Sequence, residues 1–582
     1  MSSSKEGVSL HFQKLIEQGN PVGEVIGVNK FIVSVKGLHP ANAHALVMFE
    51  DGSKGFIEHV LADSVLILHL GTEMLKIGMV AVTQHDKLVT KVGKDLVGRV
   101  INVLGEPLDG KGPIAPDSVW PVFNSAPPIY ERELLDLQLE TGVTSVDGLF
   151  PIVRGQRLAI LGDNKSGKTT LATQLTINQK NTDIKVVYVL IGKRRADIDE
   201  LLTRLNETDS LKNAVVIVST LFESLIMTYL APYVGCAIAE YFWQACDQDT
   251  MIVYDDLTSH AQAYREVALL SNISPGRDSY PGDMFYAHSS LLERAGKLMR
   301  NHKTLTSLPI VLTPNNDITA YLPTNIMSIT DGQWIMDMEV FLAGHRPALS
   351  TGLSVTRVGG VGQNKRQKGH TVATLKALAT FRQAEEYAHF GSELALSAHK
   401  DLARGKTIYE VFSQSPTETY SFMEQQLMLD IVINLDDTSN LDVKKMKENL
   451  REIAKQVKDD GDFEKWRDEL QNKSMISGTP IASTKPPEGE LSHAAVAEAK
   501  RTEPKPVEEP PLQPAAKAGD EFKPTESTKP IEGEVPQAEP AKETVHEEPV
   551  EAATQQEAEL IHIDKEGTVH KQEEKETEEV EK

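Results

Sequence analysis

The sequence predicts a multidomain chain with an N-terminal β-barrel, a central α/β domain built on a parallel sheet, a C-terminal α-helical domain and a disordered tail. Three observations predict this fold class. Short β-branched runs come first, apolar strands then alternate with helical stretches around a glycine-rich loop, and helix-spaced apolar residues precede an abrupt change to Pro and Glu. The expected segments are 1–22 (a short helical segment), 23–88 (the barrel), 89–365 (the α/β domain), 366–475 (the helical domain) and 476–582 (the tail).

The first 88 residues predict a short helix and an all-β domain. Apolar residues between Leu10 and Ile16 recur at helical spacing, enough for one or two turns that need another surface to dock on. Several short β-branched runs follow, with turn residues between them, and this is typical of a barrel. Residues 45–49 and 55–57 flank Asp51-Gly52, a strong hairpin signal. No site chemistry is visible here, so we expect a structural or assembly role.

A loop after residue 161 carries the phosphate-binding pattern G-x-x-x-x-G-K-[ST]. A short strand over 157–161 precedes it and a helix over 170–177 follows, so backbone N–H groups and the helix N-terminus converge on one point. Lys168 is expected to reach the β- and γ-phosphates, and the Thr169 hydroxyl to hold Mg²⁺. A glycine-rich turn that happens to contain Lys is the alternative, and the strand–loop–helix order argues against it. The predicted nucleotide-binding residues here are Gly162, Asp163, Asn164, Lys165, Ser166, Gly167, Lys168, Thr169 and Thr170.

The α/β domain is predicted from further apolar runs at 96–103, 186–191, 214–218 and 251–254. Separated by helical stretches, such runs indicate parallel βαβ units. The last run ends in Asp255-Asp256. Two Asp residues after a strand are a weak signal alone, but past a phosphate loop the first is the expected acid at the carboxyl edge of the sheet. Asp255 is therefore the second predicted metal residue, acting on Mg²⁺ through water.

The last third of the chain changes character twice. Val372, Leu375, Leu378 and Phe381 recur at helical spacing and predict a packed helical domain. Beyond about residue 478 the chain is rich in Pro, Glu and Lys, and such a segment cannot bury enough surface to offset its ordering entropy. We expect a solvated spacer, with a binding arm for a basic partner as the alternative; residues 560–563 are its one apolar island.

Composition excludes several classes of protein. The net charge of −24, about half of it in the tail, argues against nucleic acid as a partner. Cys236 and Cys246 lack metal-ligand spacing and suit a reducing cytoplasm. The N-terminus has no apolar core for a signal peptide, and the most apolar run, 214–239, is interrupted by Glu223 and Pro232. No transmembrane segment is expected.

Several motifs together resemble the F-type ATP synthase α subunit, over roughly residues 10–450. They are Thr141-Gly142, 151–157, 254–257, 280–286, 291–295 and 352–359. The resemblance implies ATP or ADP as the ligand with Mg²⁺, and a ring of three α and three β subunits around a rotating shaft. It also implies peripheral attachment at the cytoplasmic face of the cell membrane, with a γ shaft, a peripheral stalk with its δ subunit, and a membrane sector that carries H⁺ or Na⁺.

Residue 193 decides which of the two paralogous ring chains this one resembles. The catalytic β chain has a Glu after the strand that follows the phosphate loop, where it positions the attacking water. Here Lys193 stands at that point, followed by Arg194 and Arg195, and α chains usually carry Gln. Lys193 cannot serve as a base at neutral pH unless its pKa is heavily shifted, so its role would be charge pairing. A site that binds nucleotide without turning it over is therefore predicted, with a solvated basic cluster as the alternative.

Arg357 is the predicted catalytic residue, acting in trans. The family's Ser-Val-Ser-Arg-Val-Gly motif is kept here as residues 354–359, and the resemblance implies that Arg357 reaches the neighbouring β site as an arginine finger. Such an arginine stabilises charge on the transferring phosphoryl group and contributes about 10³–10⁵ in rate. A surface cation is the alternative reading of a lone arginine.

The resemblance also implies a base pocket. Phe341 with Arg346 and Pro347 matches the family spacing Phe-x₄-Arg-Pro beside the purine; Phe341 as a core residue is the alternative. The chain departs from the family in keeping only part of a Gln-rich stretch at 411–416, in Asn164-Lys165 within the loop, and in Ser290 where an Arg is common.

Two other functions remain open at this stage. An autonomous homohexameric ATPase, of the secretion-motor or termination-factor kind, shares the ring fold but needs a catalytic Glu where Lys193 stands. A nucleotide-binding assembly protein without a ring partner leaves Arg357 and its motif without a purpose.

Overall fold

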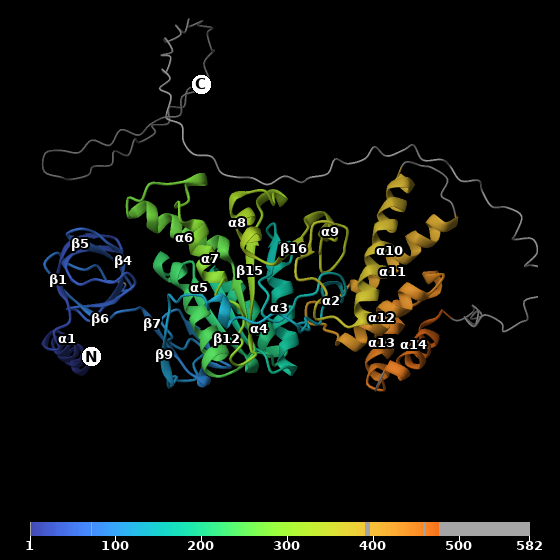
Figure 1. The fold of residues 1–582 in the computed structure, drawn as a ribbon, viewed down its shortest axis with the longest axis horizontal. Helices are drawn as coiled ribbons and strands as arrows, with labels where there is room; N and C mark the ends of the chain where they lie inside the picture. The colour runs from blue at the N-terminus through green and yellow to red at the C-terminus, as the bar shows by residue number, and fades with distance from the viewer. Residues whose placement is uncertain (1, 72, 390–395, 458–459, 477–582) are drawn as a thin grey trace, which may run out of the picture. The chain divides into compact units, whose positions relative to one another are not determined.

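The computed structural model describes residues 2–71, 73–389, 396–457 and 460–476. The chain divides into two units, Met1–Ser483 and Thr484–Lys582. The second unit lies wholly outside the described residues, as do the predictions made for the tail and for residues 560–563. Within the described residues the predicted fold class is confirmed: a barrel, an α/β domain and a helical domain follow one another along the first unit (Figure 1).

The N-terminal domain is a closed six-stranded barrel with strand order β1-β2-β5-β4-β3-β6. Its strands are β1 (Val22–Asn29), β2 (Ile32–Gly37), β3 (Leu46–Phe49), β4 (Lys54–Val60), β5 (Ser64–His69) and β6 (Val80–His85). The predicted hairpin is present, since β3 and β4 pair antiparallel with Leu46 opposite Phe56. Gly52 supplies the positive φ of 85° that this turn requires.

The N-terminal helix is longer than the sequence predicted. Helix α1 spans Ser2–Glu17 rather than one or two turns. Its Phe12 and Leu15 are buried against Met48 and Val82 of the barrel. Docking on this surface explains the extra turns, because the helix borrows stability that it lacks alone.

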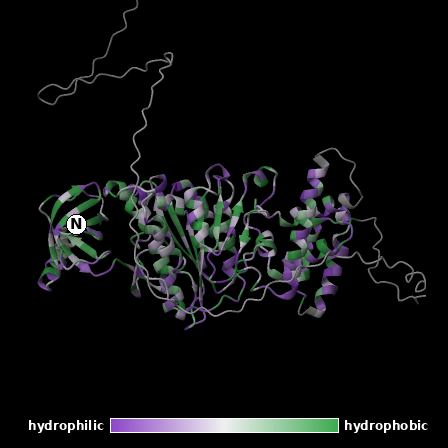
Figure 2. Ribbon diagram, turned by 45° about the horizontal axis from the view of Figure 1, so that its top comes forward, coloured by the Kyte–Doolittle hydropathy of each residue, from purple (hydrophilic) through white to green (hydrophobic). Residues whose placement is uncertain are grey.

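The α/β domain is built on a nine-stranded, mainly parallel sheet with order β17-β16-β10-β15-β13-β11-β12-β8, and β14 pairs with β15 off this path. The strands are β8 (Val100–Asn102), β10 (Ala159–Gly162), β11 (Lys185–Lys193), β12 (Ala214–Thr220), β13 (Thr250–Asp255), β14 (Gly296–Lys297), β15 (Thr304–Leu312), β16 (Gly332–Met336) and β17 (Val355–Thr356). A separate ribbon joins β7 (Val89–Val92) to β9 (Ser118–Pro121). Figure 2 shows hydrophobic residues concentrated on the central strands.

Two apolar layers cover the sheet, one on each face. On β11, Val187 and Val189 pack with α5 (Leu225–Glu240) and α6 (Leu257–Leu270), whereas Val186 and Leu190 pack with residues of α3 and α4. This alternation follows from the period-2 direction of side chains along a strand. The helices of this domain are α2 (Thr144–Leu149), α3 (Lys168–Asn178), α4 (Arg195–Glu207), α5, α6, α7 (Met284–Leu292), α8 (Tyr321–Ile329) and α9 (Met338–Leu342).

The strand predicted over 96–103 is wrong in its bounds. Residues Lys94–Leu96 form a 3₁₀ turn and only Val100–Asn102 are extended. Gly98 has φ 84°, which breaks the run, and Arg99 then forms an ion pair with Asp109 at 2.7 Å. A left-handed residue inside an apolar run ends a strand that hydrophobicity alone would continue.

Among the described residues, one helix is apolar and long enough to span a membrane by length and composition: Leu225–Ala245, which comprises α5 and a π-helical turn. Its most apolar window is 94% buried inside the described fold. A buried core helix passes the same test, so this is weak evidence for a span.

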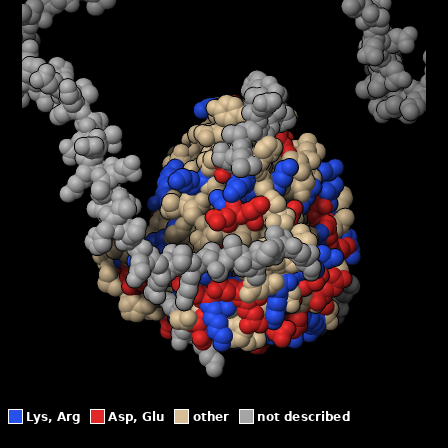
Figure 3. Space-filling view, turned by 90° about the vertical axis from the view of Figure 1, so that its right-hand side faces the viewer, with Lys and Arg blue, Asp and Glu red and all other residues tan. Residues whose placement is uncertain are grey.

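The C-terminal domain consists of α10 (Lys365–His389), α11 (Leu396–Phe412), α12 (Phe422–Asn434), α13 (Val443–Ala454) and α14 (Asp460–Ser474). Leu378, Leu427 and Leu450 are among its buried residues. Basic and acidic side chains are interspersed on the face drawn in Figure 3.

Candidate functional site

The phosphate loop joins β10 to α3 and its backbone requires glycine at two places. A Cβ on Gly162 would lie 2.6 Å from both the Met336 carbonyl oxygen and the Ser166 Oγ. Gly167 has φ 98° where the helix begins. Lys168 Nζ donates to the Asp163 carbonyl oxygen at 2.7 Å, across the loop. The sequence pattern therefore folds into the expected strand–loop–helix.

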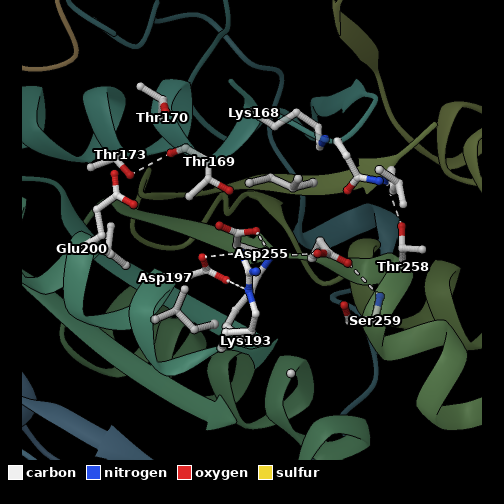
Figure 4. Close-up of a pocket in the computed structure, with 18 of the residues that line it drawn as sticks. Lys168, Thr169, Thr170, Thr173, Lys193, Asp197, Glu200, Asp255, Thr258 and Ser259 are labelled. Carbon is white, nitrogen blue, oxygen red and sulfur yellow. Dashed lines mark hydrogen bonds and ion pairs between the residues drawn. The ribbon is translucent and has the colours of Figure 1, made fainter. Parts of the chain in front are cut away.

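A cavity of about 560 Å³ opens beside this loop (Figure 4). Lys168 and Thr169 line it from α3, Lys193 from β11 and Asp255 from β13. Burial lowers the pKa of Lys168 to about 8, although the nearby Asp256 and Asp255 carboxylates act in the opposite direction. Ser166 is buried, while Asn164 and Lys165 are exposed.

Lys193 bridges the two acids at the end of β13. Strands β11 and β13 are parallel neighbours, with Leu190 opposite Asp255, so the ends of both strands meet at one edge of the sheet. Lys193 Nζ lies 2.7 Å from Asp255 Oδ1 and 2.8 Å from Asp256 Oδ2 (Figure 4). Burial lowers the pKa of Lys193, but the two carboxylates outweigh it and the net pKa lies above the usual lysine value. Lys193 is thus a partly buried charge partner rather than part of a solvated cluster.

Every carboxylate that lines this cavity in the described structure is held by a cation. Lys193 holds Asp255 and Asp256, as described above. Arg194 pairs with Asp197 at 2.9 Å, and Arg204 pairs with Glu200 at 2.5 Å. A carboxylate whose oxygens already contact a cation is less available to orient an attacking water.

The fit of Mg²⁺ to this cavity is tested by Asp255. Its Oδ1 faces Lys193, and its Oδ2 accepts a hydrogen bond from the Tyr188 hydroxyl at 3.1 Å. The Asp255 side chain is only 1% exposed. As it stands, this acid does not fit the role of ordering a metal's water shell. The assignment of Asp255 to Mg²⁺ stays a prediction, and these contacts weigh against it; Thr169 is exposed at the first turn of α3.

A second cavity of about 580 Å³ lies on the other side of the loop, lined by Gly167 and Thr170. The predicted base-pocket residues Phe341, Arg346 and Pro347 all line it. The Arg346 guanidinium carbon lies 3.5 Å from the centroid of the Phe341 ring. These three residues and the loop therefore line one cavity, together with other apolar and polar side chains.

Gln414 also lines the second cavity but is fully engaged with protein groups. Its side-chain oxygen accepts from the Thr144 N–H at 2.7 Å, and its Nε2 donates to the Gly142 and Glu418 carbonyl oxygens at 2.9 and 3.0 Å. This residue is the remnant of the Gln-rich stretch noted in the sequence. Its contacts hold the C-terminal domain against residues 142–144 and leave little for a purine.

Arg357 lines neither cavity. It follows β17 at the edge of the sheet, is exposed, and its guanidinium donates to the Thr330 and Met327 carbonyl oxygens at 3.3 and 3.2 Å. Ser290, where the family often has an arginine, donates only to the Ala287 carbonyl oxygen at 3.1 Å. The structure thus separates Arg357 from the nucleotide residues of its own chain.

Sequence reasoning missed two contributors to the site. Tyr188 hydrogen-bonds Asp255, and the Asp256 side chain caps α6 through the Ser259 N–H at 2.7 Å. Adjacency of β11 and β13 was the missing information, because it puts residues 188 and 193 beside 255.

Two parts of the chain match models of known protein families. Residues 142–356 match the nucleotide-binding domain of the ATP synthase alpha/beta family, and residues 363–482 match the C-terminal domain of the alpha/beta chain. An ATP synthase subunit alpha of Thiobacillus denitrificans is 39% identical over 426 residues, 71% of this chain and 83% of the relative. The chain belongs to the ATP synthase alpha-subunit family.

Other members of the alpha-subunit family match over a similar span. Subunit alpha of Nitrosomonas europaea is 40% identical over 437 residues, covering 73% of this chain and 85% of its own. Subunit alpha 2 of Legionella pneumophila strain Corby is 38% identical over 432 residues, covering 72% and 83%. Family membership establishes a nucleotide-binding domain and a subunit of an ATP synthase complex.

Proposed function

We propose that this chain is the regulatory, non-catalytic nucleotide-binding subunit of a rotary ATP synthase. It holds ATP or ADP at the loop between Gly162 and Thr170, with the base beside Phe341, Arg346 and Pro347. It forms a ring of three α and three β subunits and contributes Arg357 to the catalytic site of the neighbouring β subunit. The subunit alone has little or no activity.

One observation supports the non-catalytic role above the others. Each carboxylate lining the phosphate cavity in the described residues is paired with Lys193, Arg194 or Arg204. Hydrolysis needs a group that orients or deprotonates the attacking water, and the autonomous hexameric ATPase would need it here. A cavity whose acids are neutralised favours retention of the nucleotide over its turnover.

The partners follow from the same proposal. They are the catalytic β subunits, the central γ shaft and the peripheral stalk with its δ subunit; the membrane sector, which carries H⁺ or Na⁺, is reached indirectly. Nucleic acid is not a partner. The chain then works as a peripheral subunit on the cytoplasmic face of the cell membrane.

Substitution of Arg357 tests this function. In a ring assembled from the full chain and its β and γ subunits, Arg357→Ala should lower steady-state ATP turnover by about 10³-fold or more, because charge on the transferring phosphoryl group loses its partner. Nucleotide binding to the purified variant chain should equal that of the wild type. Coupled-enzyme ATPase assays and equilibrium dialysis measure the two quantities.

Arg300→Ala is the matched control, since Arg300 is another exposed arginine that donates to a backbone carbonyl, that of Gln244, at 3.1 Å. It should leave turnover unchanged. Near-wild-type turnover of the Arg357→Ala ring, or appreciable ATPase activity of the purified chain alone, would contradict the proposal.

A further inference from the structure

We infer that Lys193 serves as a built-in cation in the phosphate cavity, so that this site binds a nucleoside triphosphate with little help from Mg²⁺. The inference rests on the proposed function, because it concerns the same nucleotide site. It assigns the ligand form, a metal-free nucleotide polyphosphate, and a residue that sets this specificity.

Asp255 and Asp256 are already engaged by protein groups. Lys193 Nζ contacts both, at 2.7 and 2.8 Å. Their remaining oxygens are also engaged, since Asp255 Oδ2 accepts from Tyr188 and Asp256 Oδ1 accepts from the Ser259 N–H. A metal whose outer waters were ordered by these carboxylates would have to displace Lys193 from both of them.

The charges next to the phosphate loop are balanced without a metal. Lys168 and Lys193 together offset Asp255 and Asp256, so these four groups are neutral before any metal enters. In a cavity with a neutral residue at 193 the same floor would carry one net negative charge, facing the negative charge of the phosphates. A divalent ion relieves that repulsion. Beside Lys193 the ion instead meets a like charge, which reduces its gain.

Lys193 lies where it can also reach the ligand. The Lys193 side chain is 17% exposed and lines the same cavity as Lys168 and Thr169. An ammonium group has three N–H donors, and the acids take two of them. One donor therefore remains for a phosphate oxygen. Lys193 can neutralise the acids and contact the ligand at once, which are two roles that a bound metal would otherwise have.

Titration of the full chain with a fluorescent ATP analogue, N-methylanthraniloyl-ATP, tests the inference in EDTA and in Mg²⁺. For the wild type we expect dissociation constants within about 3-fold of one another. Lys193→Gln should bind about 10-fold or more weakly in EDTA, and Mg²⁺ should restore most of the loss. Electron paramagnetic resonance of Mn²⁺ supplies a second readout, in which the nucleotide-loaded variant should retain more Mn²⁺ than the nucleotide-loaded wild type.

Arg194→Gln is the matched control. Arg194 lines the same cavity, and its substitution removes the same charge, but its ion pair is with Asp197 rather than with Asp255 or Asp256. It should weaken binding equally with and without Mg²⁺. Wild-type binding that falls more than about 10-fold on chelation overturns the inference and leaves the nucleotide site intact. If the wild type binds the analogue neither in EDTA nor in Mg²⁺, the proposed function and the inference are both overturned.

Discussion

Asp147 is a buried acid outside the phosphate cavity whose surroundings set its charge. It lies in α2 with 3% of its surface exposed and accepts hydrogen bonds from the Thr141 and Gly142 N–H groups and from Gln425 Nε2, the last at 2.8 Å. Burial raises its pKa to about 7, although these donors act in the opposite direction. Because Gln425 comes from α12, the charge on Asp147 affects the junction between the α/β and helical domains.

The pH dependence of stability follows from this shift. Between pH 3.8, the usual value for Asp, and about 7, the folded chain keeps a proton that the unfolded chain has released. The free energy of unfolding should therefore fall as pH rises through that window, by on the order of 1–4 kcal/mol. Asp147→Asn removes this contribution, so the variant should gain stability relative to the wild type as pH rises from 5 to 8.

Urea unfolding of both proteins at each pH measures the difference. Glu58, whose pKa burial also raises to about 7, stays in both proteins and contributes a common slope. A difference between the two proteins that does not change from pH 5 to 8 would show that Asp147 is ionised throughout.

At the same scale, sequence reasoning reached the residues of the loop but not their partners. The loop motif fixes its own geometry. Gly162 has no room for a Cβ, and Gly167 has a positive φ that other residues rarely adopt. Lys193 was predicted to act as a charge partner, because a lysine is protonated at neutral pH unless its pKa is heavily shifted. Which acids it pairs with depends on the adjacency of β11 and β13, and no local pattern encodes strand order.

Among the elements, helices α10 and α11 pack so closely that a glycine of α11 lies against a phenylalanine side chain of α10. A Cβ built on Gly405 of α11 would lie 2.1 Å from Phe381 Cδ2 and 2.6 Å from Phe381 Cβ. Phe381 belongs to α10 and is 6% exposed, and its Cβ cannot move away unless the backbone of α10 moves. Helical propensity alone would favour Ala at this position. The crossing of the two helices is therefore the reason for the glycine.

Two glycine substitutions separate packing from propensity. Gly405→Ala should destabilise the helical domain by about 1–3 kcal/mol, because the added methyl group overpacks the crossing. Gly369→Ala, in α10 with no atom within 4 Å of the new Cβ, should stabilise it by about 0.5–1 kcal/mol. Thermal unfolding followed by circular dichroism tests both, and stabilisation by the Gly405 substitution would contradict the close approach.

Element boundaries were less predictable than element types. Strands β10, β11 and β13 could be recognised because each is an apolar run with a marked end. The phosphate loop follows β10, the cations that begin with Lys193 close β11, and Asp255-Asp256 close β13. The run at 96–103 misled because Gly98 reads as a tolerated strand residue until its φ of 84° is known. The length of α1 depends on the barrel surface beneath Phe12 and Leu15, which its own sequence does not describe.

At the scale of the first unit, one buried ion pair ties together segments distant in sequence. Arg294 donates to Glu240 through two nitrogens at 2.8 and 2.7 Å, and both side chains are at most 1% exposed. Glu240 also accepts from Trp120 and Asn124, and Arg294 donates to the Val122 carbonyl oxygen at 2.8 Å. The end of α5, the segment after α7 and the stretch at β9 therefore meet at a single pair of charges.

Removing one member of this pair should be costly. Glu240→Gln leaves the Arg294 charge buried without its counterion, and the expected loss is about 3–5 kcal/mol. Asp209→Asn removes an ion pair with Lys212 whose side chains are 65% and 77% exposed, and it should hardly move the unfolding midpoint because solvent already screens that pair. Urea denaturation of the two variants gives the comparison.

The double variant Glu240→Gln with Arg294→Met distinguishes a lost attraction from a stranded charge. If the cost of Glu240→Gln comes from the unpaired guanidinium, removing that guanidinium as well should recover part of the stability, since an apolar side chain of similar length needs no counterion. The cost of Glu240→Gln could instead come from weaker hydrogen bonds between residue 240 and its donors Trp120 and Asn124. In that case the double variant should be no more stable than Glu240→Gln alone. We expect recovery, because the Arg294 guanidinium is 1% exposed and gives two of its donors to the Glu240 carboxylate, so its charge is costly to leave unpaired.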